Sequence, residues 1–179
     1  MAEFLWIFWS FSLLGWVLER LFAAVTRSPR RRRRCLLLLP LCPVYGLGMA
    51  AVLALPPSLR SGWPLYLWGG LTATSVEYIY HWWGETFLGV SFWDYTGVFG
   101  NFRGRVCLPF SLAWGLLLFP AVYLVTPPVL ALADRVPIGV TWWLLLAFTA
   151  DAVCSLRFLA VTHDLEALRA VIWSVAADR

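Results

Sequence analysis

Long runs of apolar residues, separated by short polar stretches, make up most of the chain. A transmembrane helix needs about 20 predominantly apolar residues, and the pattern contains five stretches of that kind. It therefore predicts an all-α, polytopic membrane helix bundle, with one transmembrane domain over residues 1–162. The five predicted helices lie near residues 4–25, 36–55, 63–83, 106–125 and 139–161.

The remaining residues, 163–179, have a different pattern. Apolar residues recur there at helical spacing between polar ones, which predicts a cytoplasmic amphipathic helix lying on the membrane surface. The apolar positions are Leu165, Leu168, Val171, Ile172 and Val175.

The composition agrees with a membrane protein and argues against a soluble catalytic domain. Hydrophobic residues make up 61% of the 179 residues and charged residues only 13%, against about 25% charged in soluble domains. The chain also has 12 Trp, a residue that gathers where the bilayer meets water.

All 14 basic residues are Arg, and six of them fall between Arg27 and Arg34. Because cytoplasmic loops carry the excess of positive charge, this run predicts a cytoplasmic first loop, an outer N-terminus and a cytoplasmic C-terminus. We therefore expect a multi-pass protein of the cell (inner or plasma) membrane. Arg30–Arg34 could also bind anionic lipid head groups. Nucleic acid is not an expected partner, because no recognition module accompanies the run.

Polar residues within the predicted helices share a few faces. Glu19 lies on one face of the first helix with Ser12 and Gly15, so we expect it to point at protein. Counting residues from the helix ends places Glu19, Glu77 and Asp151 in the cytoplasmic half of the membrane. An ionisable group at that depth costs about 2.5–3.5 kcal/mol. Their convergence predicts a polar, partly wet acidic cavity that opens to the cytoplasm.

A structural alternative stays open for each of these carboxylates. Arg20, Arg105 or Arg157 could pair with one of them and only clamp the helices together. In that case the carboxylates would hold the bundle and bind no substrate.

The stretch from Glu77 to Cys107 carries most of the unusual polar chemistry. His81 lies four residues from both Glu77 and Glu85, so it could be a metal ligand or a proton relay, or it could simply be hydrogen-bonded. Trp93-Asp94-Tyr95 could likewise be an interfacial turn with aromatic anchors and a capping Asp. The cysteines lack the spacing typical of zinc sites. The sequence therefore predicts no metal and no cofactor.

Three blocks of the chain resemble the CmpB-type family of ABC transporter permeases. The first two are Phe11–Glu19 (FSLLGWVLE) and Leu39–Gly48 (LPLCPVYGLG). The third block matches at Glu77, Glu85, Trp93, Asp94, Tyr95, Asn101, Gly104, Arg105, Cys107, Leu108, Ser111, Trp114 and Gly115. The likeness covers about residues 4–120. This chain departs from the family pattern at His81, usually Gly, at Thr96, usually Ser, and at Gly100, usually Phe, and the departure at His81 weakens its metal or relay role.

The resemblance implies a role in transport. An ABC transporter needs an ATPase, and this sequence has no GxxxxGK[ST] phosphate loop, so the resemblance implies a separate ATPase subunit as partner. Five helices are few for a translocation path, which favours a homo-oligomer or a partner protein in the lipid bilayer.

The favoured hypothesis is a permease that binds or moves a small polar or cationic substrate through the acidic cavity. Rival hypotheses are a membrane-embedded enzyme acting on a lipid-linked substrate and a non-catalytic assembly subunit. The lack of a catalytic triad or metal motif argues against an enzyme. Glu19, Glu77 and Asp94 would be the carboxylates of the site, with Arg105 as counter-charge and Asn101 as a hydrogen-bonding support. The candidate site residues are Glu19, Tyr45, Glu77, Trp93, Asp94, Tyr95, Asn101 and Arg105, followed by Glu85, Ser111, Asp151 and His81.

Overall fold

The computed structural model describes residues 1–26 and 35–168, and most of them are helical. A 3₁₀ turn at Pro57–Leu59 and wide π-turns at Leu65–Gly69, Gly84–Leu88 and Ala121–Val125 join or extend the helices. An antiparallel hairpin, β1 (Asn101–Phe102) and β2 (Val106–Cys107), lies between α4 and α5. The helices are α1 (Ala2–Thr26), α2 (Pro43–Leu53), α3 (Gly62–Pro64), α4 (Gly70–Trp83), α5 (Leu108–Pro120), α6 (Thr126–Arg135) and α7 (Ile138–Thr162).

Among the described residues, three helical runs are long and apolar enough to cross a membrane: Ala2–Val25, Leu108–Arg135 and Ile138–Thr162. The all-α prediction is confirmed in this coarser form, as a helical protein with membrane-spanning helices. Helix α2 is apolar but has only 11 residues, which is short for a span on its own.

The second predicted helix starts later than the apolar pattern suggested. Residues 36–42 are not helical, and α2 begins at Pro43. Pro40 and Pro43 explain the difference, because proline lacks a backbone donor and disfavours helix in the residue before it. A disulfide between Cys35 and Cys42 closes this segment on itself. The prolines of this stretch predict such a break, and the structure has it.

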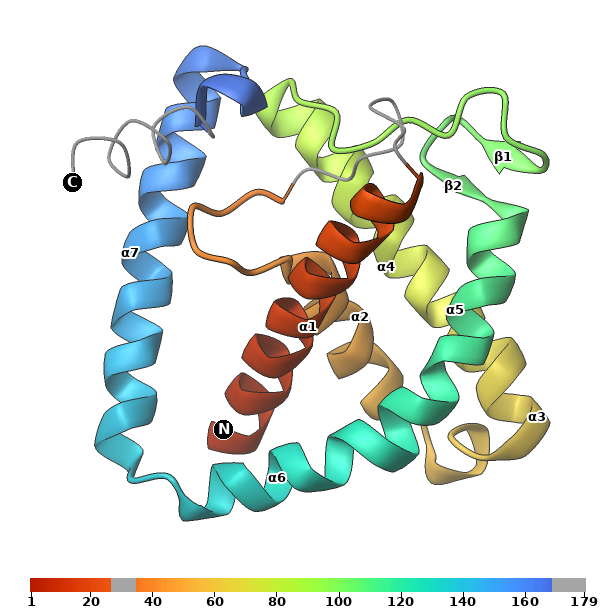
Figure 1. The fold of residues 1–179 in the computed structure, drawn as a ribbon, viewed down its shortest axis with the longest axis vertical. Helices are drawn as coiled ribbons and strands as arrows, with labels where there is room; N and C mark the ends of the chain where they lie inside the picture. Colours follow the sequence, from red (N-terminus) through yellow and green to blue (C-terminus); the bar gives the residue numbers. More distant parts are fainter. Residues whose placement is uncertain (27–34, 169–179) are drawn as a thin grey trace.

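The fourth predicted helix, near residues 106–125, does not end at residue 125, so the gap left between it and the predicted helix near 139–161 is wrong. Helix continues through the π-turn Ala121–Val125 into α6, and Pro127 and Pro128 lie in the first turn of α6. The first turn of a helix tolerates proline because its N–H groups have no intrahelical partner. The run bends here, and α6 lies across the end of the molecule near the N-terminus (Figure 1).

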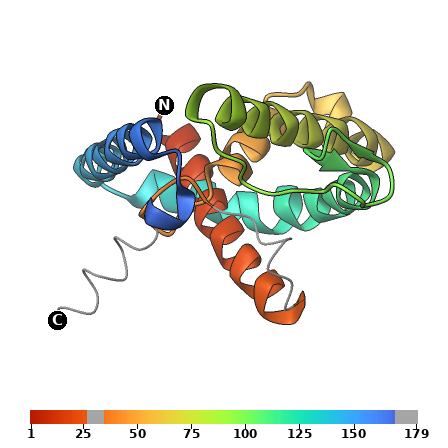
Figure 2. The ribbon, with the colours of Figure 1, turned by 90° about the horizontal axis from the view of Figure 1, so that it is seen from above.

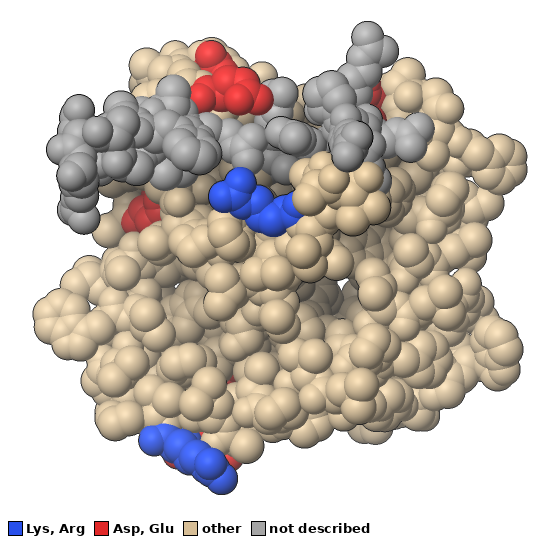
Figure 3. All heavy atoms as spheres, viewed as in Figure 1, with Lys and Arg blue, Asp and Glu red and all other residues tan. Residues whose placement is uncertain are grey.

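The helices are arranged around α1. Seen from above, α7 lies on one side of α1, and α4 and α5 lie on the other (Figure 2). One end of the molecule carries the last turn of α1, the connector between α4 and α5, and the end of α7, whereas the opposite end carries the N-terminus and α6 (Figure 1). On the face seen in Figure 3, the visible charged side chains lie toward these two ends, and the broad band between them is almost free of charge.

Two clusters of buried side chains hold this arrangement. One, near the connector, includes Tyr80, Phe92 and Tyr95, and the other, toward the opposite end, includes Ile7 and Val52. The start of the predicted amphipathic tail joins the first cluster, because Leu165 and Leu168 are buried. The rest of the tail, and the Arg30–Arg34 run proposed to bind lipid head groups, lie outside the described residues.

Candidate functional site

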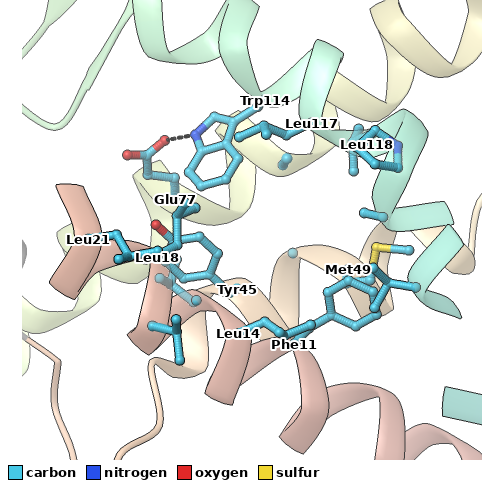
Figure 4. Close-up of a pocket in the computed structure, with 18 residues that line it drawn as sticks. Phe11, Leu14, Leu18, Leu21, Tyr45, Met49, Glu77, Trp114, Leu117 and Leu118 are labelled. Atoms are coloured by element: carbon cyan, nitrogen blue, oxygen red, sulfur yellow. Dashed lines mark hydrogen bonds between the residues drawn. The ribbon is translucent and has the colours of Figure 1, made fainter.

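A cavity of about 350 Å³ lies between α1, α2, α4 and α5 (Figure 4). Its lining is almost entirely apolar, and it includes Phe11, Leu14 and Leu18 of α1, Met49 of α2 and Leu117 of α5. We call this space the apolar cavity. Among its described lining residues, one carboxylate is present, that of Glu77.

Glu77 is held by two donors that come from different parts of the chain. The indole Nε1 of Trp114 donates to Oε2 at 2.7 Å, and the hydroxyl of Tyr95 donates to Oε1 at 3.1 Å. Figure 4 shows the bond from Trp114 at the rim of the cavity. The Glu77 side chain is only 2% exposed. Buried polar groups of this kind are stable only when hydrogen-bonded, and the two donors meet that requirement for both oxygens.

A second space of about 220 Å³ adjoins the apolar cavity. The two share Leu18, Tyr45, Trp114 and Leu117 in their walls. The other lining residues of the second space are Glu19, Phe22, Tyr95, Phe110 and Ala113. Because aromatic rings dominate its lining, we call it the aromatic chamber.

The rings around the aromatic chamber are packed against one another. The hydroxyl of Tyr45 donates to Glu19 Oε1, and its ring meets the ring of Trp114 edge to face at 5.2 Å. Tyr95 stacks on Phe110 at 5.0 Å. Tyr45 and Trp114 thus form the wall that the two spaces share, and each ring bonds a different carboxylate.

The connector places Tyr95 against Glu77. Its hairpin turns at Arg103 and Gly104, which have φ values of 54° and 69°, and glycine adopts such values without strain. The N–H of Tyr95 donates to the carbonyl of Gly104 at 2.8 Å, and Trp93 Nε1 donates to the carbonyl of Arg105 at 2.7 Å. The hairpin therefore fixes the backbone from which Tyr95 reaches into the bundle.

Asp94 and Asn101 support turns of the connector and line neither cavity. Asp94 Oδ1 accepts from the N–H of Thr96 at 2.8 Å. Asn101 donates through Nδ2 to the carbonyl of Val98 and accepts at Oδ1 from the N–H of Gly104. These contacts match the interfacial-turn interpretation of Asp94. A substrate-binding role for either residue stays a prediction.

Arg105 is not the counter-charge of the cavity carboxylates. Its Nε donates to Glu85 Oε2 at 2.7 Å, and its Nη1 donates to the hydroxyl of Tyr78 at 2.8 Å. The hydrogen bond to Glu85 is the main reason that the pKa of Arg105 is raised above its ordinary value. In the structure Arg105 pairs with Glu85, because the hairpin carries it to the start of the π-turn Gly84–Leu88, where Glu85 lies.

Glu85 also contacts His81, as their four-residue spacing on the helix predicts. His81 Nε2 lies 3.1 Å from Glu85 Oε1 and 3.3 Å from the hydroxyl of Ser91. Over residues 1–26 and 35–168, no group of three or more His, Cys, Asp and Glu side chains is placed to hold a metal ion. The observed surroundings of His81 are those of a hydrogen-bonded histidine.

Asp151 lies on α7 and lines neither cavity, so it does not converge with Glu19 and Glu77. Its two carboxylate oxygens accept from the backbone N–H groups of Leu38 and Leu39, each at 3.1 Å, and Ser155 donates to it at 3.2 Å. These amides belong to the non-helical residues 36–42, which have no helical ladder to satisfy them. Asp151 therefore supplies the acceptors that the broken backbone lacks.

Helix α5 carries one candidate site residue, Ser111, and one residue of the site that was not a candidate, Trp114. Ser111 donates to the carbonyl of Cys107 at 3.1 Å and serves the start of α5. Trp114, absent from the candidates, is central, because it bonds Glu77 and separates the two spaces. A signal existed in the sequence: a tryptophan buried within a helix needs an acceptor for its N–H, and carboxylates on neighbouring helices are such acceptors.

The fold and these spaces define a helical membrane protein with an internal cavity. The chain belongs to the family described as "Putative ABC-transporter type IV" (CmpB), whose family model matches residues 6–156. The resemblance seen in the sequence is thus confirmed, and the match extends beyond residue 120 to include Asp151. No curated protein and no solved structure matches the chain.

Proposed function

We propose that this protein is the membrane-embedded subunit of a transporter and that it binds its substrate in the apolar cavity and the aromatic chamber. The observation that carries this proposal is Glu77, a buried carboxylate with both oxygens hydrogen-bonded at the rim of an otherwise apolar cavity. Ionisable groups within a membrane are costly and mark substrate or ion sites by default. The family to which the chain belongs supports transport as the use of the site.

The energy for transport would come from a separate ATPase subunit, since the sequence has no phosphate-binding loop of its own. The cavity lies within one copy of the chain, so a single copy can hold a substrate. A homo-oligomer is proposed for the translocation path, because five helices are few for such a path.

The larger cavity is less acidic than the acidic, cytoplasm-facing cavity predicted from the sequence. The lining of the larger space is apolar, and its carboxylate lies on one wall. A substrate that fits it carries an apolar part as well as a cationic or hydrogen-bond-donating group, which narrows the small polar or cationic class expected from the sequence.

We also propose five membrane passes, with the N-terminus outside and the C-terminus cytoplasmic, in the cell membrane. Helices α1, α2, α4, α5 and α7 run in alternating directions (Figure 1), which supports this count. The second pass would contain the non-helical residues 36–42, and Asp151 accepts hydrogen bonds from two of their backbone N–H groups. The Arg27–Arg34 run supports the orientation. The Cys35–Cys42 disulfide favours the reverse, because disulfides persist in oxidising compartments.

Cysteine labelling distinguishes the two orientations. In a background without Cys107 and Cys154, we expect a membrane-impermeant maleimide to label the Ser58→Cys variant in intact cells. The Ser28→Cys variant should react only after the membrane is permeabilised. Labelling of Ser28→Cys alone in intact cells would reverse the proposed orientation, and labelling of both positions would remove the second pass, which lies between them.

Glu77→Gln tests the transport proposal. The substitution keeps the shape of the side chain and an acceptor for Trp114, so the protein should fold, but it removes the charge that faces the substrate. Untargeted mass spectrometry of cells and medium should find at least one compound whose distribution depends on the wild-type protein. Its gradient should fall at least tenfold with Glu77→Gln.

Glu85→Gln is the matched control for this experiment. It removes the same charge from the same helical run, outside both spaces, and should leave the gradient within about twofold of the wild type after correction for protein amount. A wild-type gradient with Glu77→Gln would overturn the transport proposal. A large loss of thermal stability with no change in transport per folded molecule would identify Glu77 as a clamp of an assembly subunit.

A further inference from the structure

The β1–β2 hairpin presents two aromatic rings at the surface of the molecule. Phe99, two residues before β1, is 78% exposed, and Phe102, within β1, is 57% exposed. One side of the Phe102 ring packs against Tyr78 of α4, with the ring centroids 5.6 Å apart, so the fold fixes the orientation of its exposed side. Exposed apolar groups that adjoin one another mark a site of contact with a protein or a membrane.

Helix α5, which follows the hairpin, has an exposed apolar face. Leu108, Leu112 and Leu116 recur at intervals of four residues, so they lie on one side of the helix, and they are 44–63% exposed. They belong to the run Leu108–Arg135, which is long and apolar enough to cross a membrane. In a bilayer, such a face meets the hydrocarbon chains of lipids.

The hairpin lies where this face of α5 reaches the end of the helix. The N–H of Leu108, the first residue of α5, donates to the carbonyl of Gly100 at 3.2 Å. Phe99 and Phe102 lie within two residues of Gly100, so the exposed rings adjoin the exposed leucines. In Figure 1 the hairpin lies at the end of α5 that is away from α6 and projects to the side of the molecule. The apolar surface of the helix thus continues onto the hairpin.

The turn of the hairpin carries an exposed cation, Arg103. Its guanidinium lies 5.6 Å from the centre of the Phe102 ring, within the range of a cation–π contact. In the part of the chain that the structure describes, Arg103 forms no ion pair, whereas Arg105 is paired with Glu85. The φ of Arg103 is 54°, a value that glycine or asparagine adopts more easily. The turn by itself therefore does not call for an arginine.

We infer that the hairpin is an anchor at the membrane surface. The rings of Phe99 and Phe102 lie at the level of the lipid head groups, and Arg103 binds the phosphate of an anionic lipid. Aromatic rings are best solvated at this level, and arginine there extends its charge outward to the head groups. Continuity with the exposed face of α5 favours the bilayer over a protein partner. The anchor operates in either orientation of the chain and does not depend on transport.

The anchor also bears on the surroundings of Glu77. Gly104 follows Arg103, and its carbonyl accepts a hydrogen bond from the N–H of Tyr95 at 2.8 Å. The hydroxyl of Tyr95 in turn donates to Glu77 at 3.1 Å. A lipid phosphate that holds Arg103 therefore also steadies the backbone from which Tyr95 reaches Glu77.

Spin labelling measures the depth of the hairpin in the membrane. A nitroxide is attached to the Phe99→Cys variant of the full-length protein, in a background without Cys107 and Cys154, in nanodiscs of phosphatidylcholine and phosphatidylglycerol. Oxygen concentrates in hydrocarbon and a nickel chelate stays in water, so the ratio of their collision rates with the label reports its depth. Leu116→Cys, on the exposed face of α5, and Ser58→Cys, in the exposed 3₁₀ turn after α2, are the references.

We expect the ratio at Phe99→Cys to lie between those of the two references, as it does at the level of the head groups. A ratio equal to that of Ser58→Cys would place the hairpin in water, and one equal to that of Leu116→Cys would place it among the hydrocarbon chains. Low collision rates with both reagents would mean that a protein, such as a second copy of the chain, covers the hairpin. Each of these three results overturns the inference.

Quenching by labelled lipids tests the phosphate contact. A bimane fluorophore on Phe99→Cys is quenched by nitroxide-labelled lipids that touch it, so the quenching gives the preference for phosphatidylglycerol over phosphatidylcholine at this place. One arginine near an anionic surface contributes about 1 kcal/mol, so we expect a preference of about fivefold. Arg103→Asn, which suits the left-handed backbone, should reduce the preference to nearly one, and Arg103→Lys should keep it within about twofold of the starting value.

Arg135→Gln is the matched control for the phosphate contact. It removes the same charge at the far end of the molecule, in the last turn of α6 (Figure 1), and should leave the preference unchanged. An equal fall in Arg135→Gln would show a general effect of charge. That result, or an unchanged preference in Arg103→Asn on protein with the melting temperature of the starting protein, would overturn the role of Arg103.

Discussion

Replacing Asp151 by Ala should lower the free energy of unfolding by about 1–3 kcal/mol, because two backbone N–H groups would lose their acceptors. The affected amides, those of Leu38 and Leu39, belong to a segment without helical hydrogen bonds. The loss can be measured by titrating the protein in nonionic micelles with SDS and following its unfolding.

Two further variants separate this effect from a general weakening of α7. Asp151→Asn keeps one oxygen acceptor and should lose about half as much stability. Ser155→Ala removes only the third partner of Asp151, leaves both amides bonded, and should cost less than about 1 kcal/mol. If Asp151→Ala proves as stable as Ser155→Ala, the support of residues 36–42 by Asp151 is wrong.

Gly46→Ala should destabilise the protein by about 1–3 kcal/mol or more, the range found when a packed interface is overfilled. A methyl group at this position would lie 2.4 Å from the backbone oxygen of Phe8 and 2.4 Å from the hydroxyl of Ser12 on α1. Backbone cannot move aside as a flexible side chain can, so α1 and α2 would have to separate. Because Tyr45 precedes Gly46, its bond to Glu19 should weaken too. Thermal unfolding measures the combined loss of stability.

Gly48 provides the matched control on the same helix. A methyl group there would meet nothing within 4 Å, so Gly48→Ala should be neutral or should stabilise the protein by up to about 1 kcal/mol through its higher helix propensity. Equal losses in the two variants would mean that the close approach of α1 and α2 does not determine the effect.

The packing face of α1 could be predicted from the sequence because it depends on local spacing alone. Ser12, Gly15 and Glu19 recur at helical intervals, and in the structure each of them meets α2. The broken start of α2 was also predictable, since Pro40 and Pro43 restrict the backbone wherever they occur. These predictions needed no knowledge of how distant parts of the chain meet.

The partners of the polar side chains could not be predicted in the same way. Arg105 reaches Glu85 only because the hairpin turns at Arg103 and Gly104, and Asp151 reaches Leu38 only because α7 packs beside residues 36–42. The predicted helices are all similarly apolar, so the hydrophobic pattern does not show which of them pack side by side. It therefore leaves the partners of their polar side chains open. The end of the helix near 106–125 was predicted wrongly for a related reason. Proline breaks a helix when it lies in the helix interior, but it is tolerated in the first turn. The π-turn before Pro127 and Pro128 places them in a first turn, and the sequence alone does not show this.

The contact between Tyr45 and Trp114 has a thermodynamic consequence for the two carboxylates. Each ring donates a hydrogen bond to a different carboxylate, and the rings touch each other. Free-energy changes add only for sites that share no partners, whereas neighbours in one network are coupled by about 0.5–3 kcal/mol. Glu19 and Glu77, on helices that are far apart in the sequence, thus form a single energetic unit, and the effect of losing either one depends on whether the other is present.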